Sequence, residues 1–134
     1  MVCAAAQPVV IHFEIDLKGP PQRVYEALTD SKQFAAVTGA PAEIQREAGG
    51  SFSLFGGHIH GRNVELVSSR RVVQAWRAAD WPEGVYSIAR FELKPQGSGT
   101  RLVFDHTGFP PELKAPLEEG WEEHYWATLR RFFK

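Results

Sequence analysis

The sequence predicts an α+β fold in which one curved antiparallel sheet wraps around a long C-terminal helix, with two short helices after the first strand. Three observations predict it. Residues 9–17 alternate apolar and polar side chains, residues 42–107 form short apolar runs separated by turn-rich breaks, and residues 117–133 change to helical spacing. Short connections between consecutive strands favour an antiparallel meander, and a sheet of so many twisted strands must curl.

The first part of the chain predicts a strand followed by two helices. Every odd-numbered residue of 9–17 is apolar, which is typical of a strand with one buried face. Pro20 and Pro21 then suit the first turn of a helix. A second short helix covers residues 31–37, with Asp30 or Ser31 as its N-cap.

The middle of the chain predicts successive strands, at residues 42–46, 50–54, 58–67, 70–78, 85–94 and 101–107. Glycines at positions 49, 50, 56, 57 and 61 lie where a curled sheet needs bulges or tight bends. The terminal helix spans residues 117–133, with Pro116 at its start.

Composition narrows the class of protein. The chain has 134 residues, so we expect one domain over residues 9–134 and a flexible N-terminus over residues 1–8. With 15 Lys and Arg against 16 Asp and Glu, no basic excess favours nucleic acid. No apolar run is long enough for a membrane span. Cys3 is the single cysteine, so no internal disulfide can form, which fits a reducing cytoplasmic location. We expect Cys3 to have no catalytic role.

Aromatic residues make up 12% of the chain and indicate a ring-lined volume inside the sheet. Strand faces and helical spacing bring rings and a few polar groups together, while the small Ser87 leaves space, and such a lining is usual for a small-molecule site. The candidate ligand-binding residues are Phe52, Arg62, Gln74, Trp76, Ser87, Phe104, His106, Trp121 and Tyr125.

Within this set Arg62, Gln74 and His106 are the expected polar handles. The alternative is plain packing, in which rings such as Phe104 fill the core and the buried polar groups find partners within the protein.

Catalytic and metal motifs are weak. His58 and His60 share one side of a strand, but no ligand spacing completes a zinc site, so we expect no metal and no cofactor. The sequence has no nucleophile elbow and no phosphate-binding glycine loop. Asp105 and His106 are successive strand residues that point to opposite faces, so they form no dyad. Binding is therefore favoured over catalysis, with His106 as a general base left open.

Arginine side chains are expected on the outer face of the sheet. Arg77, Arg90 and Arg101 lie at positions opposite the buried faces, where salt links contribute only ~0–1 kcal/mol. The four glutamates of residues 118–123 are expected on the solvated side of the last helix.

Four motifs in order resemble one known family. They are Gly49-Gly50-x-Phe52-x-x-Phe55-x-Gly57-x-Ile59-x-Gly61, Gln74-x-Trp76-Arg77-x-x-x-Trp81-Pro82, Thr100-x-Leu102-x-Phe104-x-His106-x-Gly108-x-Pro110 and Gly120-Trp121-x-x-x-Tyr125-Trp126. The chain resembles, from about residue 13 to residue 133, the activator of heat-shock protein 90 ATPase homologue family. That family belongs to the START-like (SRPBCC, birch-pollen-allergen-like) helix-grip superfamily.

The resemblance implies a sheet that grips the C-terminal helix around a cavity for a small apolar or aromatic molecule. It also implies a second function, in which the chain is a co-chaperone that stimulates a chaperone ATPase in the stress response. A third, a cyclase- or hydrolase-like enzyme using His106, stays open, as does the choice between monomer and homodimer.

Overall fold

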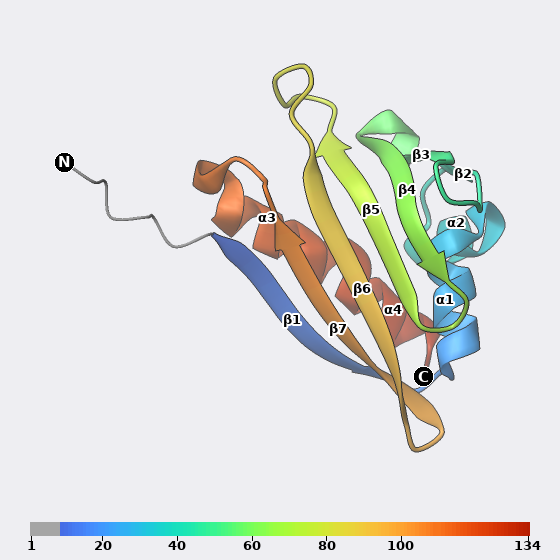
Figure 1. The fold of residues 1–134 in the computed structure, drawn as a ribbon. Coiled ribbons are helices and arrows are strands. Elements are labelled where there is room, and N and C mark those ends of the chain that lie inside the picture. Colours follow the sequence, from blue (N-terminus) through green and yellow to red (C-terminus); the bar gives the residue numbers. More distant parts are fainter. Residues whose placement is uncertain (1–8) are drawn as a thin grey trace.

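The computed structural model describes residues 9–134, so the predictions for Cys3 and for a flexible N-terminus lie outside the described residues. Its centre is a seven-stranded antiparallel sheet with strand order β1-β7-β6-β5-β4-β3-β2 (Figure 1). The strands are β1 (Val10–Leu17), β2 (Ala42–Ile44), β3 (Ser51–Leu54), β4 (Ile59–Val67), β5 (Arg71–Ala78), β6 (Ser87–Gln96) and β7 (Gly99–Thr107). The predicted antiparallel meander is confirmed for β2 to β7.

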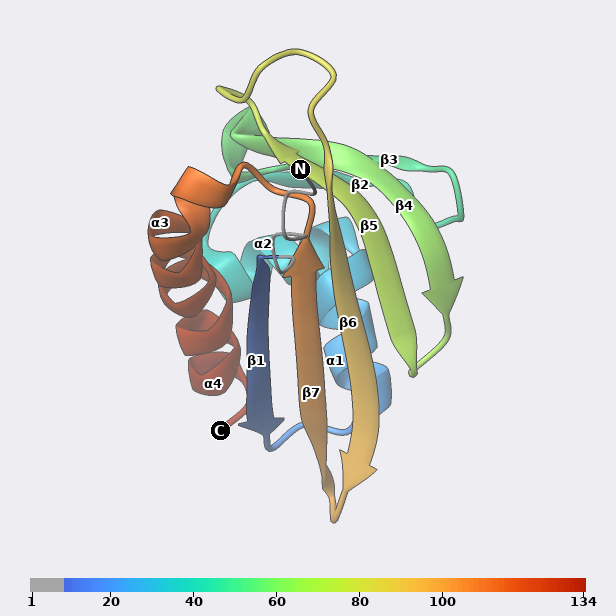
Figure 2. The same ribbon diagram turned by 60° about the vertical axis from the view of Figure 1, so that its left-hand side comes forward.

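The sheet curves around the helices, as predicted. Figure 2 shows β3, β4 and β5 arching over the side on which the helices lie. Two irregularities accompany the curve. A register shift between Asn63 and Glu65 marks a bulge in β4. At Gly61 the backbone approaches β5 so closely that an added Cβ would collide with the carbonyl oxygen of Ala75. Only glycine fits there.

Two short helices follow β1, as the prolines predicted. Helix α1 (Pro21–Thr29) begins with Pro21 in its first turn, and α2 (Ser31–Thr38) follows directly. The Asp30 side chain accepts a hydrogen bond of 3.0 Å from the Gln33 backbone N–H, so Asp30 is the N-cap of α2. Gly39, with φ of 74°, ends that helix in the left-handed conformation.

The C-terminal helix differs in detail from the prediction. A 3₁₀ turn, η2 (Pro111–Leu113), leads directly into α3 (Lys114–Gly120), so the helix begins at Lys114 rather than at residue 117. The next segment, η3 (Trp121–Trp126), is π-helical, and α4 (Ala127–Phe132) completes the helix. The Ala127 backbone N–H bonds to the Glu122 carbonyl five residues back, which is the mark of a π-helix.

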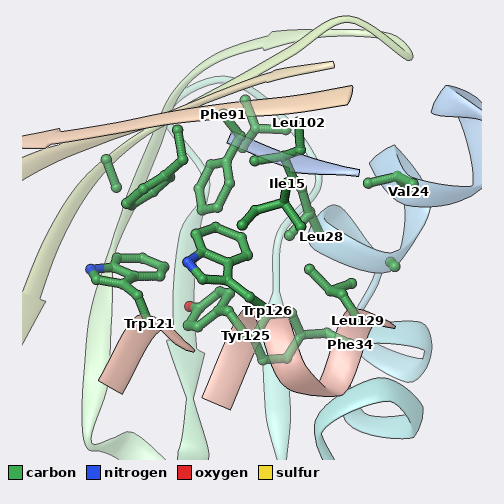
Figure 3. Packing of buried hydrophobic residues seen from close by; sticks show 14 of the residues in the cluster. Ile15, Val24, Leu28, Phe34, Phe91, Leu102, Trp121, Tyr125, Trp126 and Leu129 are labelled. Carbon is green, nitrogen blue, oxygen red and sulfur yellow. The ribbon is translucent and has the colours of Figure 1, made fainter. Parts of the chain in front are cut away.

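The core lies between the sheet and the C-terminal helix. Figure 3 shows Trp126 projecting from the helix toward Phe91 of the sheet, while Leu129 lies beside Leu28 of α1 and Phe34 of α2. Trp126 and Phe104 are fully buried, with ring centroids 5.1 Å apart. Such ring pairs add to the free energy of apolar burial. No helix in residues 9–134 is long and apolar enough to cross a membrane.

Candidate ligand pocket

A hollow of about 410 Å³ opens between the C-terminal helix and the end of the sheet formed by β4 and β5. We call it the sheet–helix pocket. It is lined by Phe55, His58, Ile59, Trp76, Pro116, Leu117, Gly120, Trp121, His124 and Tyr125. Its volume falls in the range of about 300–1,000 Å³ that is usual for small-molecule sites.

Burial separates the floor of the pocket from its rim. Trp76, Trp121 and Tyr125 are buried and form the floor. His58, Pro116 and His124 are exposed and form the rim. The pocket is therefore apolar inside, and the imidazoles of His58 and His124 lie at its opening to solvent.

The floor is assembled from two elements. Trp76 lies on the concave face of β5, opposite Gly61 of β4. Trp121 and Tyr125 come from η3, and the Trp121 centroid lies 5.1 Å from that of Trp76 and 4.3 Å from that of Tyr125. The helix thus lays two rings against the tryptophan of the sheet, and Figure 3 shows Trp121 and Tyr125 side by side.

Several buried polar atoms have no hydrogen-bond partner within residues 9–134. They are Trp76 Nε1, Tyr125 OH, Gln74 Oε1 and Trp126 Nε1, all buried. An unpaired buried polar group costs about 1–3 kcal/mol. Burial also raises the pKa of Tyr125 above its usual value, so its phenol stays neutral.

His106 lies behind the floor in a closed hydrogen-bond chain. The Trp121 indole N–H donates to His106 Nδ1 at 3.0 Å, and His106 Nε2 lies 2.7 Å from Ser87 Oγ. Ser87 Oγ in turn donates to the Trp76 carbonyl at 2.7 Å. Because the Ser87 hydroxyl proton goes to that carbonyl, His106 carries its proton on Nε2. Burial lowers the pKa of His106 from 6.5 to about 3.

These hydrogen bonds indicate a structural role for His106. Both ring nitrogens are satisfied within the protein, so neither is free for a ligand or a substrate proton. A base with so low a pKa is also poorly matched to chemistry near pH 7. The hydrogen bonds of His106 instead join η3 to β6 and β7 and fix the orientation of the Trp121 ring.

The structure brings some of the predicted residues together and not others. Trp76, Trp121 and Tyr125 line the sheet–helix pocket. The remaining concave-face residues are buried behind it, namely Phe52, Gln74, Ser87, Phe104 and His106. The Gln74 amide donates to Asn63 Oδ1 at 3.4 Å.

The prediction that Arg62 points into the cavity is wrong. Arg62 pairs with Ser51 and Ala75 on the convex face, is exposed, and donates to the Gly49 carbonyl at 2.9 Å. The reason is strand alternation, because Gly61 occupies the inward position of β4 next to it.

Arg77 lies on the outer face as predicted, but it is not a surface salt-link residue. Its guanidinium is buried under the loop after β5, where it donates to the carbonyls of Pro82, Val85 and Trp81 at 2.8, 3.1 and 2.8 Å and to that of Ala79 at 3.4 Å. Arg90 and Arg101, by contrast, pair with carboxylates at the surface.

Several pocket residues were missed by sequence reasoning. Phe55 lies in the 3₁₀ turn η1 (Phe55–Gly57), and His58 follows that turn instead of lying on a strand. The Gly56-Gly57 pair was the available signal, since it predicts a turn and therefore residues that leave the sheet plane. Among residues 9–134 no group of His, Cys, Asp and Glu side chains is arranged to hold a metal ion.

Comparison with known proteins gives a consistent result. The model of the family described as "Activator of Hsp90 ATPase homolog 1-like protein" matches residues 18–134. A human protein named activator of 90 kDa heat shock protein ATPase homolog 1 is 26% identical over 113 residues, which is 84% of this chain and 33% of the human protein. The chain thus spans about a third of the length of the curated relatives it matches.

Solved structures show the same fold. The crystal structure of an HSP90 activator from Plasmodium falciparum matches with a TM-score of 0.86 and 24% identity, over 92% of this chain and 94% of the other. The solution structure of an Aha1 dimer from Colwellia psychrerythraea matches with a TM-score of 0.79 and 19% identity, over 93% and 96% of the two chains. The predicted helix-grip architecture is confirmed.

Proposed function

The chain belongs to the Activator of Hsp90 ATPase homolog 1-like protein family, and within that fold we propose that it binds a small apolar or aromatic molecule. One observation carries the proposal: the sheet–helix pocket, about 410 Å³ of space floored by Trp76, Trp121 and Tyr125. A ligand there would cover rings that now face the pocket, and burial of apolar surface favours binding by about 25 cal/mol per Å² before the costs of association.

Gly120 makes the proposal testable without disturbing the core. It lines the pocket in helical backbone, and beyond its chain neighbours and the backbone of its own helix a Cβ added there meets no atom within 4 Å. Gly120→Leu would therefore place a side chain in the open space beside the floor while removing a helix-interior glycine, which is itself destabilising. Ala115→Leu is the matched control, since Ala115 is exposed on the same helix and does not line the pocket.

The probe is 2-naphthamide, a neutral two-ring molecule. We expect saturable binding by calorimetry and shifts of the Trp76 and Trp121 indole N–H signals by NMR. Gly120→Leu should abolish both, and Ala115→Leu should leave both unchanged. Absence of binding, or binding that Gly120→Leu leaves intact, would refute the proposal.

A second function is stimulation of the ATPase of an Hsp90-class chaperone. Family membership favours it, together with the names of the curated relatives. It is a proposal for this chain, which aligns with only a third of those relatives. Adding the purified chain to such a chaperone and measuring ATP turnover tests it, and an unchanged rate at saturating chain removes it.

A further inference from the structure

We propose that the occupant of the sheet–helix pocket is an aromatic carboxylic acid, with its ring on the floor and its carboxylate at the rim between His58 and His124. This inference rests on the proposed ligand-binding function and adds the chemical class and orientation of the ligand.

The two imidazoles line the same pocket from two different elements. His58 follows η1 on the sheet side, and His124 belongs to η3 on the helix side. The Phe55 and His124 rings lie 5.7 Å apart, so the turn and the helix meet at this edge of the pocket. Both histidines are exposed, and no hydrogen bond from either side chain to another described residue occupies its ring nitrogens.

The lining contains no Asp, Glu, Lys or Arg side chain. Apart from the two imidazoles, its ionisable member is Tyr125, whose buried phenol stays neutral. The floor consists of rings and holds no counter-charge, so an ionised group placed there would lose its hydration without compensation. A charged head is therefore favourable at the rim and unfavourable at the floor.

The acidic residues of the same helix face elsewhere. A separate groove, bordered by Phe13 of β1, is lined by Glu118, Glu119, Glu122 and Glu123. Arg77 of β5 is turned to the convex side and bonded to loop carbonyls. The helix thus presents carboxylates on one flank and His124 on the other. An anionic head at the rim meets donors and no lining carboxylate.

The charge of the ligand gives the proposal a measurable signature. A carboxylic acid with a pKa near 4 is ionised near neutral pH, whereas the matching amide carries no charge. Imidazole N–H groups donate to carboxylate oxygens, and hydrogen bonds to charged acceptors are stronger than those to neutral ones. Exposed contacts of this kind contribute modestly, so the two imidazoles together should tighten naphthoate binding about fivefold.

The experiment compares 2-naphthoate with its neutral counterpart 2-naphthamide by calorimetry, in the natural chain and in the double variant His58→Leu, His124→Leu, which removes both imidazole donors. We expect the naphthoate dissociation constant, divided by that of the amide, to rise about fivefold in the double variant. The amide measures how far the two substitutions alter the pocket itself, so the ratio isolates their effect on the carboxylate.

The outcomes separate the two proposals. If neither probe binds, the proposed function fails and this inference fails with it. If both bind but the ratio of the two dissociation constants is the same in the natural chain and in the double variant, the pocket stands and the carboxylate assignment is overturned.

Discussion

Burial of His106 makes the stability of the protein depend on pH in a way that can be worked out from the structure. Its pKa is lowered to about 3 in the folded state by burial, against 6.5 for an ordinary histidine. Between these values the unfolded chain binds a proton that the folded chain does not. Stability is therefore full above pH 6.5 and is lost as the pH falls toward 3.

The size of the effect follows from the two pKa values. At pH 5 the unfolded side chain is almost fully protonated and the folded one almost fully neutral, which gives a loss of about 2 kcal/mol relative to pH 8. The full loss, below pH 3, would be on the order of 5 kcal/mol. Most single domains have only about 5–15 kcal/mol in total, so the effect is large enough to measure.

The assay is urea unfolding at pH 8, 7, 6 and 5, followed by circular dichroism, for the natural chain and for His106→Gln. Glutamine can accept from the Trp121 indole and donate to Ser87 Oγ, so it retains both bonds of His106 without titrating. We expect the variant to lose about 2 kcal/mol less than the natural chain between pH 8 and pH 5. Parallel pH profiles for the two chains would refute the reasoning.

His12 contributes a pH dependence of stability that is opposite in sign to that of His106, so the experiment needs a control for it. Its pKa is raised by hydrogen bonds to Asp105 and then Glu14, at 2.6 and 3.0 Å. A raised folded pKa stabilises the protein fully below pH 6.5, and that contribution is lost as the pH rises through the folded value. Repeating the comparison in a His12→Gln background removes this opposing slope and leaves that of His106.

Three further changes test separate features of the fold by urea unfolding. Tyr125→Phe removes an unpartnered buried hydroxyl, so we expect unchanged stability or a gain of up to about 1 kcal/mol, and a clear loss would show that the hydroxyl has a partner. Arg77→Met leaves the loop carbonyls without their donor and should lower the free energy of unfolding by about 2–4 kcal/mol. The exposed Arg90→Met should lower it by less than about 1 kcal/mol, and equal losses would contradict the role of Arg77 in anchoring the loop after β5. Gly61→Ala forces a Cβ against the backbone of β5 and should cost more than about 3 kcal/mol, while Gly120→Ala should gain about 0.5–1; a tolerated Gly61→Ala would mean that the strands can separate.

The general architecture could be predicted because its elements are encoded locally. Alternation in β1 and the capping residue Asp30 depend on neighbouring residues alone. Residues of β4 were harder to place, because two inward positions in the middle of the strand are held by Gly61 and Asn63. Neither is apolar, so the sequence pattern did not mark the inward face, and Arg62 was assigned to the wrong side.

The remaining differences depend on contacts that are distant in the sequence or on small changes of period. Arg77 is buried only because the loop after β5 folds back over it. Spacings of three and four residues fit both an α-helix and a helix with one π-helical turn, so nothing distinguished η3 in advance. His58 and His124 are far apart in the chain, and only the folded structure brings them to one rim.

The π-helical segment lets the two ends of the C-terminal helix be adjusted independently. An α-helix turns by about 100° per residue, so one additional residue within η3 rotates everything on one side of it relative to the other. Lengthening or shortening this segment by a single residue would turn Trp121 to a new direction while Leu129 kept its position beside Leu28 of α1 and Phe34 of α2. A lineage could therefore reshape the sheet–helix pocket through a one-codon insertion or deletion, without rebuilding the interior that holds the molecule folded.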